Sequence, residues 1–376
     1  MTGGKRRRKR VLLIALGIAA FVPAAVWAGI WALPGFGSFR LGAAEAAGYA
    51  ARSANFREGK FVNEAEFPVM EKVPEGTQTG VLSRKEGLPG EELPVETPDL
   101  SPAPAGGALR FTWLGHSSLL LQTEGMNILY DPVLGDSLSP VSFGGVKRYS
   151  AVPLEPEALP AIDLLLLTHD HYDHLDYTTI RRLDSRVRQY VAPLGVEKRL
   201  IRFGVDPGKI IAMAWWEELE IGPLTVGCTP SRHFSGRNLW DRGKTLWCSF
   251  VLRTSALQIF LSGDGGYADH FQAIRDRYGP FDLAFMECGQ YDLRWPSVHM
   301  SPEEAYAALE TLGAARAVPI HWAAFRLASH PWDDGPVRLV SAGSGGEIHI
   351  LTPRIGQTVS WEEADDYRER WYEAIP

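Results

Sequence analysis

The sequence predicts an α/β fold that is preceded by an N-terminal transmembrane helix. Two observations predict the fold: short apolar runs have the length of buried strands, and several of them end in histidine or aspartate. The clearest run is residues 164–168, four leucines and a threonine, which can be buried on both faces of a sheet but is too short for a helix on its own. A third observation, 23 consecutive uncharged residues at 11–33, predicts the transmembrane helix, because such a length exceeds the roughly 30 Å of a bilayer's hydrocarbon core.

The N-terminus combines this apolar segment with a basic cluster. Six lysine or arginine residues lie within residues 1–10, so the formal net charge of −7 leaves −13 for the rest of the chain. Positive charge before the segment predicts a cytoplasmic tail at 1–10, a single-pass anchor at 11–33 and a body on the extracytoplasmic side. A cleaved signal peptide, with Ala25–Ala28 as its cleavage site, is the alternative, but the apolar run continues to Leu33. The acidic body argues against a nucleic-acid partner.

The remaining chain divides into two parts. Residues 34–107 are expected to be a linker and N-terminal arm, because five prolines between residues 88 and 107 exclude a regular helix. Residues 108–376 are expected to form the globular domain. The three cysteines, Cys228, Cys248 and Cys288, are odd in number and widely spaced, which predicts small buried side chains and neither disulfides nor a CxxC zinc site.

Turn and capping residues delimit the elements of the domain. A helix is predicted after Ser301, with Pro302 at its first position, Glu304 completing a capping box and Gly313 beyond its end. Two further helices are predicted at 177–183 and at 193–203, the second ending at Gly204. Strands are predicted at 109–114, 118–123, 128–130, 164–168, 224–229, 257–261 and 315–320.

Metal-binding residue types gather where these strands end. Residues 169–176 contain three histidines and three aspartates in an HxHxDH pattern, and the later strands run into His233, Asp264 and His321. Ligand sites of α/β sheets lie at the carboxyl ends of the strands, so these residues are expected to converge. The seven candidate ligands are His169, His171, Asp173, His174, His233, Asp264 and His321.

Seven ligands are too many for one tetrahedral zinc ion and suit two metals that share a carboxylate. Asp264 is the candidate bridge, because Gly263, Gly265 and Gly266 leave room beside it. The imidazole-rich set favours two Zn²⁺ ions, with iron or manganese as alternatives.

The order HxHxDH, His, Asp, His resembles the metallo-β-lactamase superfamily. The similarity is greatest to its N-acylphosphatidylethanolamine-hydrolysing phospholipase D branch, and it covers roughly residues 108–335 and a patch at Asn55–Asn63. The other motifs that carry it are Trp113–His116, Asp131–Pro132, Trp215–Glu217, Thr229–His233, Gly263–Asp264, Gly266–Tyr267, Gly279–Leu283, Tyr291, Arg294–Trp295, His299, Pro302–Ala305 and Ile320–Trp322.

The resemblance implies a four-layer αββα sandwich with a binuclear site at one edge of the sheets. It assigns His169, His171 and His233 to one zinc ion and Asp173, His174 and His321 to the other, with Asp264 as the bridge. It also implies that His299 lines the site and that Asp131 is a strand-end carboxylate close to the metals. A homodimer is an expectation that only the resemblance carries.

Two positions depart from the branch pattern. Gly265 stands where the branch usually has a threonine, and Met286–Gly289 replaces a more apolar stretch and adds the carboxylate of Glu287. These departures bear on the substrate and leave the seven ligands intact.

The function expected from the resemblance is a membrane-anchored binuclear zinc phosphodiesterase of the phospholipase D type, acting on N-acylphosphatidylethanolamine or a related phospholipid. Asp173 or Asp131 would orient the nucleophile, and His299 or His321 would assist the leaving group. Arg294 is a phosphate contact or a surface ion pair, and His116 supports the site or packs in the core. The alternatives are a lactonase of phosphorylated sugars, a nucleotide phosphodiesterase and a non-catalytic scaffold, although a scaffold would be expected to lack ligands that this chain retains.

Overall fold

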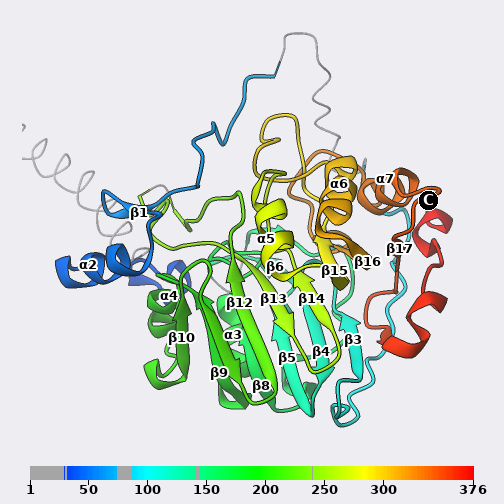
Figure 1. Cartoon of the computed structure of the whole chain (residues 1–376), viewed down its shortest axis with the longest axis horizontal. Helices are drawn as coiled ribbons and strands as arrows, with labels where there is room; N and C mark the ends of the chain where they lie inside the picture. Colours follow the sequence, from blue (N-terminus) through cyan, green and yellow to red (C-terminus); the bar gives the residue numbers. More distant parts are fainter. Residues whose placement is uncertain (1–28, 30–31, 74–86, 141–143, 239) are drawn as a thin grey trace, which may run out of the picture.

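The computed structural model describes residues 29, 32–73, 87–140, 144–238 and 240–376, and two seven-stranded sheets form its centre (Figure 1). The first has the order β10-β9-β8-β5-β4-β3-β18 and the second the order β11-β12-β13-β14-β15-β16-β17. The strands of the first sheet are β3 (Leu109–Trp113), β4 (Leu119–Thr123), β5 (Met126–Tyr130), β8 (Ile162–Leu166), β9 (Val187–Pro193), β10 (Ile210–Met213) and β18 (Thr358–Ser360). Those of the second are β11 (Glu218–Ile221), β12 (Leu224–Thr229), β13 (Ser249–Arg253), β14 (Gln258–Leu261), β15 (Phe281–Glu287), β16 (Ala314–Ile320) and β17 (His349–Ile350).

Strand direction places many loop residues at one edge of each sheet. In the first sheet β5 and β8 are parallel, and β3 has the same direction because β4 is antiparallel to both β3 and β5. In the second sheet β14, β15 and β16 are parallel, and β12 has their direction because β13 is antiparallel to β12 and to β14. The residues that follow all these strands therefore emerge at the same edge of their sheet.

The two sheets and the helices form four layers. The leucines of β8 and its extension show why: Leu164 and Leu166 belong to the core between the sheets, whereas Leu165 and Leu167 pack with Ile180 and other residues on the outer side. Alternate residues of a strand point to opposite faces, so an unbroken apolar run is buried on both. The predicted α/β fold with two sheets is confirmed, and the three cysteines are free and buried as expected.

Helices cover the outer face of each sheet. The helices are α2 (Ala43–Arg52), α3 (Tyr177–Leu183), α4 (Val196–Phe203), α5 (His270–Tyr278), α6 (Pro302–Leu312) and α7 (Asp334–Ala342). Residues of α3 and α4 pack on the first sheet, and those of α5, α6 and α7 pack on the second; Figure 1 shows α6 beside α7 and α4 beside β10. The predicted capping box is present: Ser301 accepts the Glu304 N–H, and Gly313 adopts a left-handed conformation at the end of α6.

The start of α4 differs from the prediction. Pro193 is the last residue of β9, and the helix begins at Val196, because Gly195 turns the chain with a φ of 91°. The predicted end at Gly204 is confirmed by its φ of 97° and by its N–H bonds to the last helical turn.

The segment expected to be a linker carries regular structure. It contains the short 3₁₀ helix η1 (Pro34–Phe36), helix α2, and the hairpin of β1 (Phe56–Arg57) and β2 (Lys60–Phe61). Residues 87–107 contain no helix and contact the domain through an isolated bridge between Val95 and Ile355. The smaller elements are β6 (Ser137–Leu138), β7 (Val146–Lys147), η2 (Pro156–Ala158), η3 (Asp184–Arg186), η4 (Pro207–Lys209), η5 (Trp361–Asp366) and η6 (Trp371–Ala374).

The predicted tail at 1–10 and almost all of the predicted transmembrane segment at 11–33 lie outside the described residues. Among the helices of the described part, none has both the length and the apolar character to cross a bilayer.

Candidate metal centre

The carboxyl edges of both sheets supply one cluster of histidines and carboxylates. From the first sheet come His116, in the turn after β3, and the residues 169–174 that follow β8. From the second sheet come His233 after β12, Asp264 after β14, Glu287 at the end of β15 and His321 after β16. All seven predicted ligands lie in this cluster, although they span 153 positions of the sequence from 169 to 321.

Three imidazoles form one half of the cluster. The Nδ1 of His171 lies 2.9 Å from His169 Nε2 and 3.2 Å from His233 Nε2. The three nitrogens lie within 4.8 Å of one another, a spacing that suits one shared metal ion. These are the three residues that the family resemblance assigns to one of the two ions.

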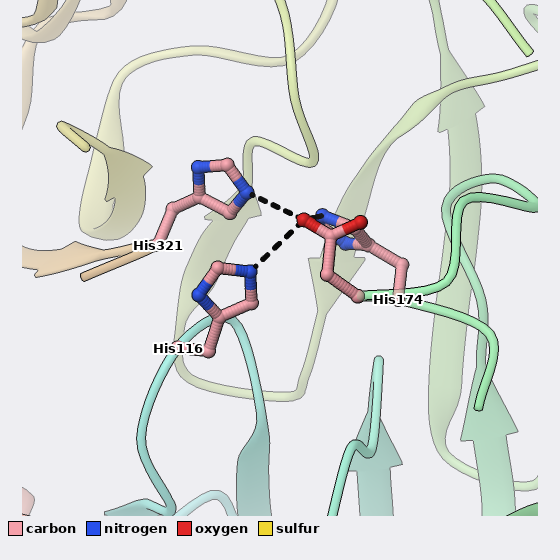
Figure 2. Close-up of side chains that lie close together, drawn as sticks. His116, His174 and His321 are labelled. Carbon is pink, nitrogen blue, oxygen red and sulfur yellow. Dashed lines mark hydrogen bonds and ion pairs between the residues drawn. The ribbon is translucent and has the colours of Figure 1, made fainter. Parts of the chain in front are cut away.

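The other half combines a carboxylate with three imidazoles. Asp173 Oδ2 lies 3.1 Å from His116 Nε2, 3.4 Å from His321 Nε2 and 3.7 Å from His174 Nε2. Figure 2 shows the rings of His116, His174 and His321 turned toward a common point. The structure therefore places His116, which is fully buried, beside the group predicted for the second ion.

Asp264 lies between the two halves. Its Oδ2 atom is 3.1 Å from His174 Nε2, 3.2 Å from His321 Nε2, 3.8 Å from His169 Nε2 and 3.9 Å from His233 Nε2. Its Oδ1 atom is buried and has no hydrogen-bond partner among the described residues. A buried carboxylate oxygen without a partner is costly unless a cation is near it, so this position suits a bridging ligand.

Hydrogen bonds behind the rings determine which ring nitrogen faces the cluster. His169 Nδ1 lies 2.9 Å from Thr168 Oγ1, whose own hydrogen is donated to Asp131, and His233 Nδ1 lies 3.0 Å from the carbonyl of Val298. Both Nδ1 atoms therefore carry hydrogen, which leaves the Nε2 lone pairs pointing inward, as in metal-ligating histidines. His174 has the same arrangement, with Nδ1 2.7 Å from Asp131 Oδ2.

The electrostatics fit divalent cations. Burial and neighbouring imidazoles lower the pKa of His169 and of His233 well below the ordinary value, so these rings are neutral ligands. Burial alone would raise the pKa of Asp264, but His174 and His321 hold it well below its usual range. Burial alone would lower the pKa of His174, but Asp264, Asp173 and Asp131 raise it well above its ordinary value. The neutral imidazoles of His169 and His233, together with the carboxylates of Asp173 and Asp264, form a donor set that suits zinc or iron. The residues present thus fit a metal pair, without specifying the metal.

Asp131 reaches the centre only through other residues. It is fully buried, and its oxygens accept the N–H of Thr168 at 2.8 Å, the Oγ1–H of Thr168 at 2.6 Å and the Nδ1–H of His174. These bonds orient His174 and the start of the metal-binding loop. The structure therefore places Asp131 as a positioning residue behind the ligands, while Asp173 and His299 face the cluster directly.

Glu287 is a carboxylate of this chain that extends the cluster. It is fully buried, its Oε1 accepts the Gly265 N–H at 2.7 Å, and its Oε2 lies 2.9 Å from His299 Nδ1 and 3.7 Å from His321 Nδ1. Burial and the Asp264 carboxylate raise the pKa of Glu287 well above its ordinary value. Glu287 thus connects His299, which retains some solvent exposure, with the loop that carries Asp264.

Gly265 is required by this arrangement. A Cβ atom at residue 265 would overlap with Ser231 Oγ, and that hydroxyl donates a hydrogen bond to the Asp264 carbonyl. A threonine therefore does not fit here unless Ser231 moves, which explains the departure noted in the sequence.

Arg294 is not brought to the cluster by any contact in the described part of the chain. Its guanidinium pairs with Asp292 at 2.6 Å and donates to Ser329 Oγ at 3.0 Å. Of the two sequence interpretations, the structure shows the ion pair.

Two supporting residues were not singled out by the sequence. Asn63 donates from Nδ2 to the carbonyl of His233 at 2.7 Å and accepts its N–H at 3.2 Å, so it holds the backbone of a predicted ligand. Gln290 donates to the His321 carbonyl at 3.3 Å and to that of Phe325 at 3.0 Å. The only sequence signal for Asn63 is its place in the Asn55–Asn63 patch.

The backbone of the centre adopts unusual conformations. His116, Asp131, Gln290, His321 and Ala323 all have positive φ angles, between 38° and 71°. His116 and His321 also connect the two sheets: the His321 N–H donates to the His116 carbonyl at 2.9 Å, and the His116 N–H donates to the carbonyl of Trp322 at 3.1 Å. Residues other than glycine adopt such angles uncommonly, and those that do often cluster at functional sites.

Comparison with known proteins identifies related families. Residues 126–322 match the model of the beta-lactamase superfamily domain. An uncharacterized protein of Mycobacterium tuberculosis is 35% identical over 363 residues, which are 93% of this chain and 96% of the relative. N-acyl-phosphatidylethanolamine-hydrolyzing phospholipase D 1 of Caenorhabditis elegans is 32% identical over 259 residues, 64% of this chain and 72% of that protein. The isothiocyanate hydrolase from Delia radicum gut bacteria has a similar fold, with a TM-score of 0.54 and 21% identity over 67% of this chain and 98% of that structure.

Proposed function

The chain belongs to the metallo-β-lactamase superfamily, in the branch similar to N-acylphosphatidylethanolamine-hydrolysing phospholipase D. On this premise we propose that it is a binuclear zinc phosphodiesterase that hydrolyses N-acylated phosphatidylethanolamine or a related phospholipid. Its products would be phosphatidate and an N-acyl amino alcohol.

The observation that carries the proposal is the division of the cluster into two ligand groups around Asp264. His169, His171 and His233 offer three nitrogens on one side, and Asp173, His174 and His321 offer mixed ligands on the other. A pair of bound divalent ions would supply hydroxide at neutral pH and would neutralise the charge that develops on phosphoryl oxygens. Phosphodiester hydrolysis needs both contributions.

The chain's own residues would perform the remaining tasks. The position of the His299 ring is set by a buried carboxylate, since its Nδ1 lies 2.9 Å from Glu287 Oε2. We assign to His299 the binding of a phosphoryl oxygen or the transfer of a proton to the departing alkoxide. Asp173 would orient the nucleophile, because its Oδ2 faces the ligands of the second group.

Membrane attachment is part of the proposal. The apolar run at 11–33 and the basic residues before it support a single-pass anchor with the catalytic domain on the extracytoplasmic side. An anchor would keep the site close to lipid and raise its effective concentration there. Protease protection tests this orientation. With the predicted topology, protease that reaches the extracytoplasmic face of the membrane digests the domain, whereas protease that reaches the cytoplasmic face leaves it intact.

The test of the function uses the purified full-length protein with measured metal content. We expect about two zinc ions per chain, and release of phosphatidate from vesicles that contain N-acylphosphatidylethanolamine. His171→Ala should lose both metal and activity, because it removes a nitrogen that lies close to both His169 and His233. A zinc-loaded protein that leaves these lipids intact and cleaves a soluble lactone instead would contradict the proposal.

A further inference from the structure

Two buried arginines lie beneath the metal-binding loop. Arg199, on α4, is fully buried, and Arg237, in the loop after β12, is 5% exposed. Buried guanidinium groups are rare and need several partners, so their contacts indicate what they hold together.

Arg237 binds the backbone near both ends of the loop His169–His174, which carries four of the seven candidate ligands. Its Nη1 donates to the carbonyl of Asp170 at 2.9 Å and to that of Leu175 at 2.8 Å. Its Nε and Nη2 donate to the carbonyl of Gly35 at 3.1 and 2.8 Å. The ring of Tyr172, in the same loop, lies 3.9 Å from the guanidinium carbon. One side chain thus joins the N-terminal segment to the loop.

Arg199 makes a second connection. Its Nε donates to Asp170 Oδ2 at 2.9 Å, its Nη2 to Asp241 Oδ2 at 2.8 Å, and its Nη1 to the carbonyl of Gly37 at 2.6 Å. The other oxygen of Asp241 accepts the N–H of Arg237 at 2.9 Å. Two arginines therefore balance two buried carboxylates, and one of these carboxylates directly follows the ligand His169.

The contacted N-terminal segment permits little change. A Cβ atom at Gly35 would overlap with the carbonyl oxygen of Pro140. Gly37 has a φ of 60°, and a Cβ atom there would lie 2.8 Å from the Cδ of Arg199. Both glycines let the backbone approach closely enough for its carbonyls to reach the arginines.

We infer that Arg199 and Arg237 are positioning residues that hold the segment Gly35–Gly37 against the loop His169–His174, so that this segment contributes to the affinity of the site for metal. The connection is notable for its place in the chain, because the segment directly follows the predicted membrane anchor. The inference rests on the metal centre of the proposed function and is independent of the substrate.

The experiment measures zinc affinity of metal-free full-length protein by competition with a chromophoric chelator. Gly37→Ala alters the segment, because its Cβ atom would press against the side chain of Arg199. Arg199→Lys alters the arginine: it keeps the charge but removes the planar guanidinium that reaches two carboxylates and a carbonyl. Outer contacts of metal ligands typically change affinity 10- to 100-fold, and we expect zinc to bind about 10-fold more weakly or worse in both variants.

Matched controls separate positioning from general damage. Gly48 lies on the exposed face of α2, where an added Cβ atom would meet nothing within 4 Å, and Arg188 is exposed on β9. The control variants Gly48→Ala and Arg188→Lys should therefore bind zinc as the unaltered protein does. Circular dichroism establishes that each variant is folded.

The outcomes are distinguishable. Folded Gly37→Ala and Arg199→Lys proteins that bind zinc within twofold of the unaltered protein overturn the inference. So does a loss of melting temperature that is equal in the metal-free and zinc-loaded forms, because it indicates a purely structural role. If the unaltered protein itself binds no zinc, the proposed function fails as well, whereas failure to cleave the lipid leaves the affinity comparison unaffected.

Discussion

Replacing Asp264 with asparagine removes the central negative charge of the cluster while keeping the size of the side chain. The Oδ2 atom of Asp264 lies between 3.1 and 3.9 Å from ring nitrogens of His174, His321, His169 and His233. Removing one partner of a buried charge pair costs about 3–5 kcal/mol. Since each 1.4 kcal/mol is a factor of ten, we expect metal binding to weaken by roughly 100- to 4,000-fold.

The assay measures zinc affinity by chelator competition and activity by mass spectrometry of released phosphatidate. Asp264→Asn should lose activity at zinc concentrations that saturate the unaltered protein, and excess zinc should restore part of it. Asp269→Asn is the control, because Asp269 lies five residues further along the same loop and belongs to none of the candidate metal groups of the described residues. If Asp264→Asn binds two zinc ions with unaltered affinity, the assignment of Asp264 as the bridge is refuted.

Three further predictions follow from the site and the core. Glu287→Ala leaves His299 Nδ1 and the Gly265 N–H without their partner, which costs about 1–3 kcal/mol for each buried group, and it should lower kcat/KM about 10- to 100-fold. The control is Glu303→Ala, at the exposed start of α6, which should leave kcat/KM unchanged. Equal kinetics in the two variants would contradict the role of Glu287. Chelator treatment should abolish lipid hydrolysis and lower the melting temperature, with both restored by zinc; activity that survives complete metal removal, checked by elemental analysis, would exclude the metal mechanism. Trp322→Ala removes a buried ring from the core and should lower the free energy of unfolding, measured by denaturant titration, by about 3–5 kcal/mol. A loss below about 1 kcal/mol would show instead that neighbouring side chains repack to fill the cavity.

The strand ends of the site were predictable from the sequence because each has a local signature. An apolar run followed by a histidine or aspartate identifies both the strand and the residue at its end, and strands of one direction bring such residues to one edge. The HxHxDH segment and Asp264 could therefore be placed together from the order of residues alone. The helix after Ser301 was predictable for a similar reason, since its capping residues act within a single turn.

Contacts between distant segments were not predictable. Glu287 stands out in the sequence as an added carboxylate at the end of an apolar strand, but only the three-dimensional arrangement shows that it contacts the amide of Gly265 and the ring of His299. The role of Gly35 and Gly37 depends on arginines that lie about 160 and 200 residues further along the chain. Helix α2 was missed because the glycine- and alanine-rich sequence around it was interpreted as a linker, although alanine itself favours helix.

The positive φ angles at the centre determine where this protein can be made more thermostable. Strained residues cost of order 1–3 kcal/mol each, and those of His116 and His321 are tied to ligand geometry, so relieving them would sacrifice the site. Glu58, with a φ of 51°, lies instead in the exposed hairpin turn between β1 and β2, next to Gly59. Such turns favour Asn-Gly, so Glu58→Asn is the first substitution to make for a more thermostable protein, while His116 and His321 are kept.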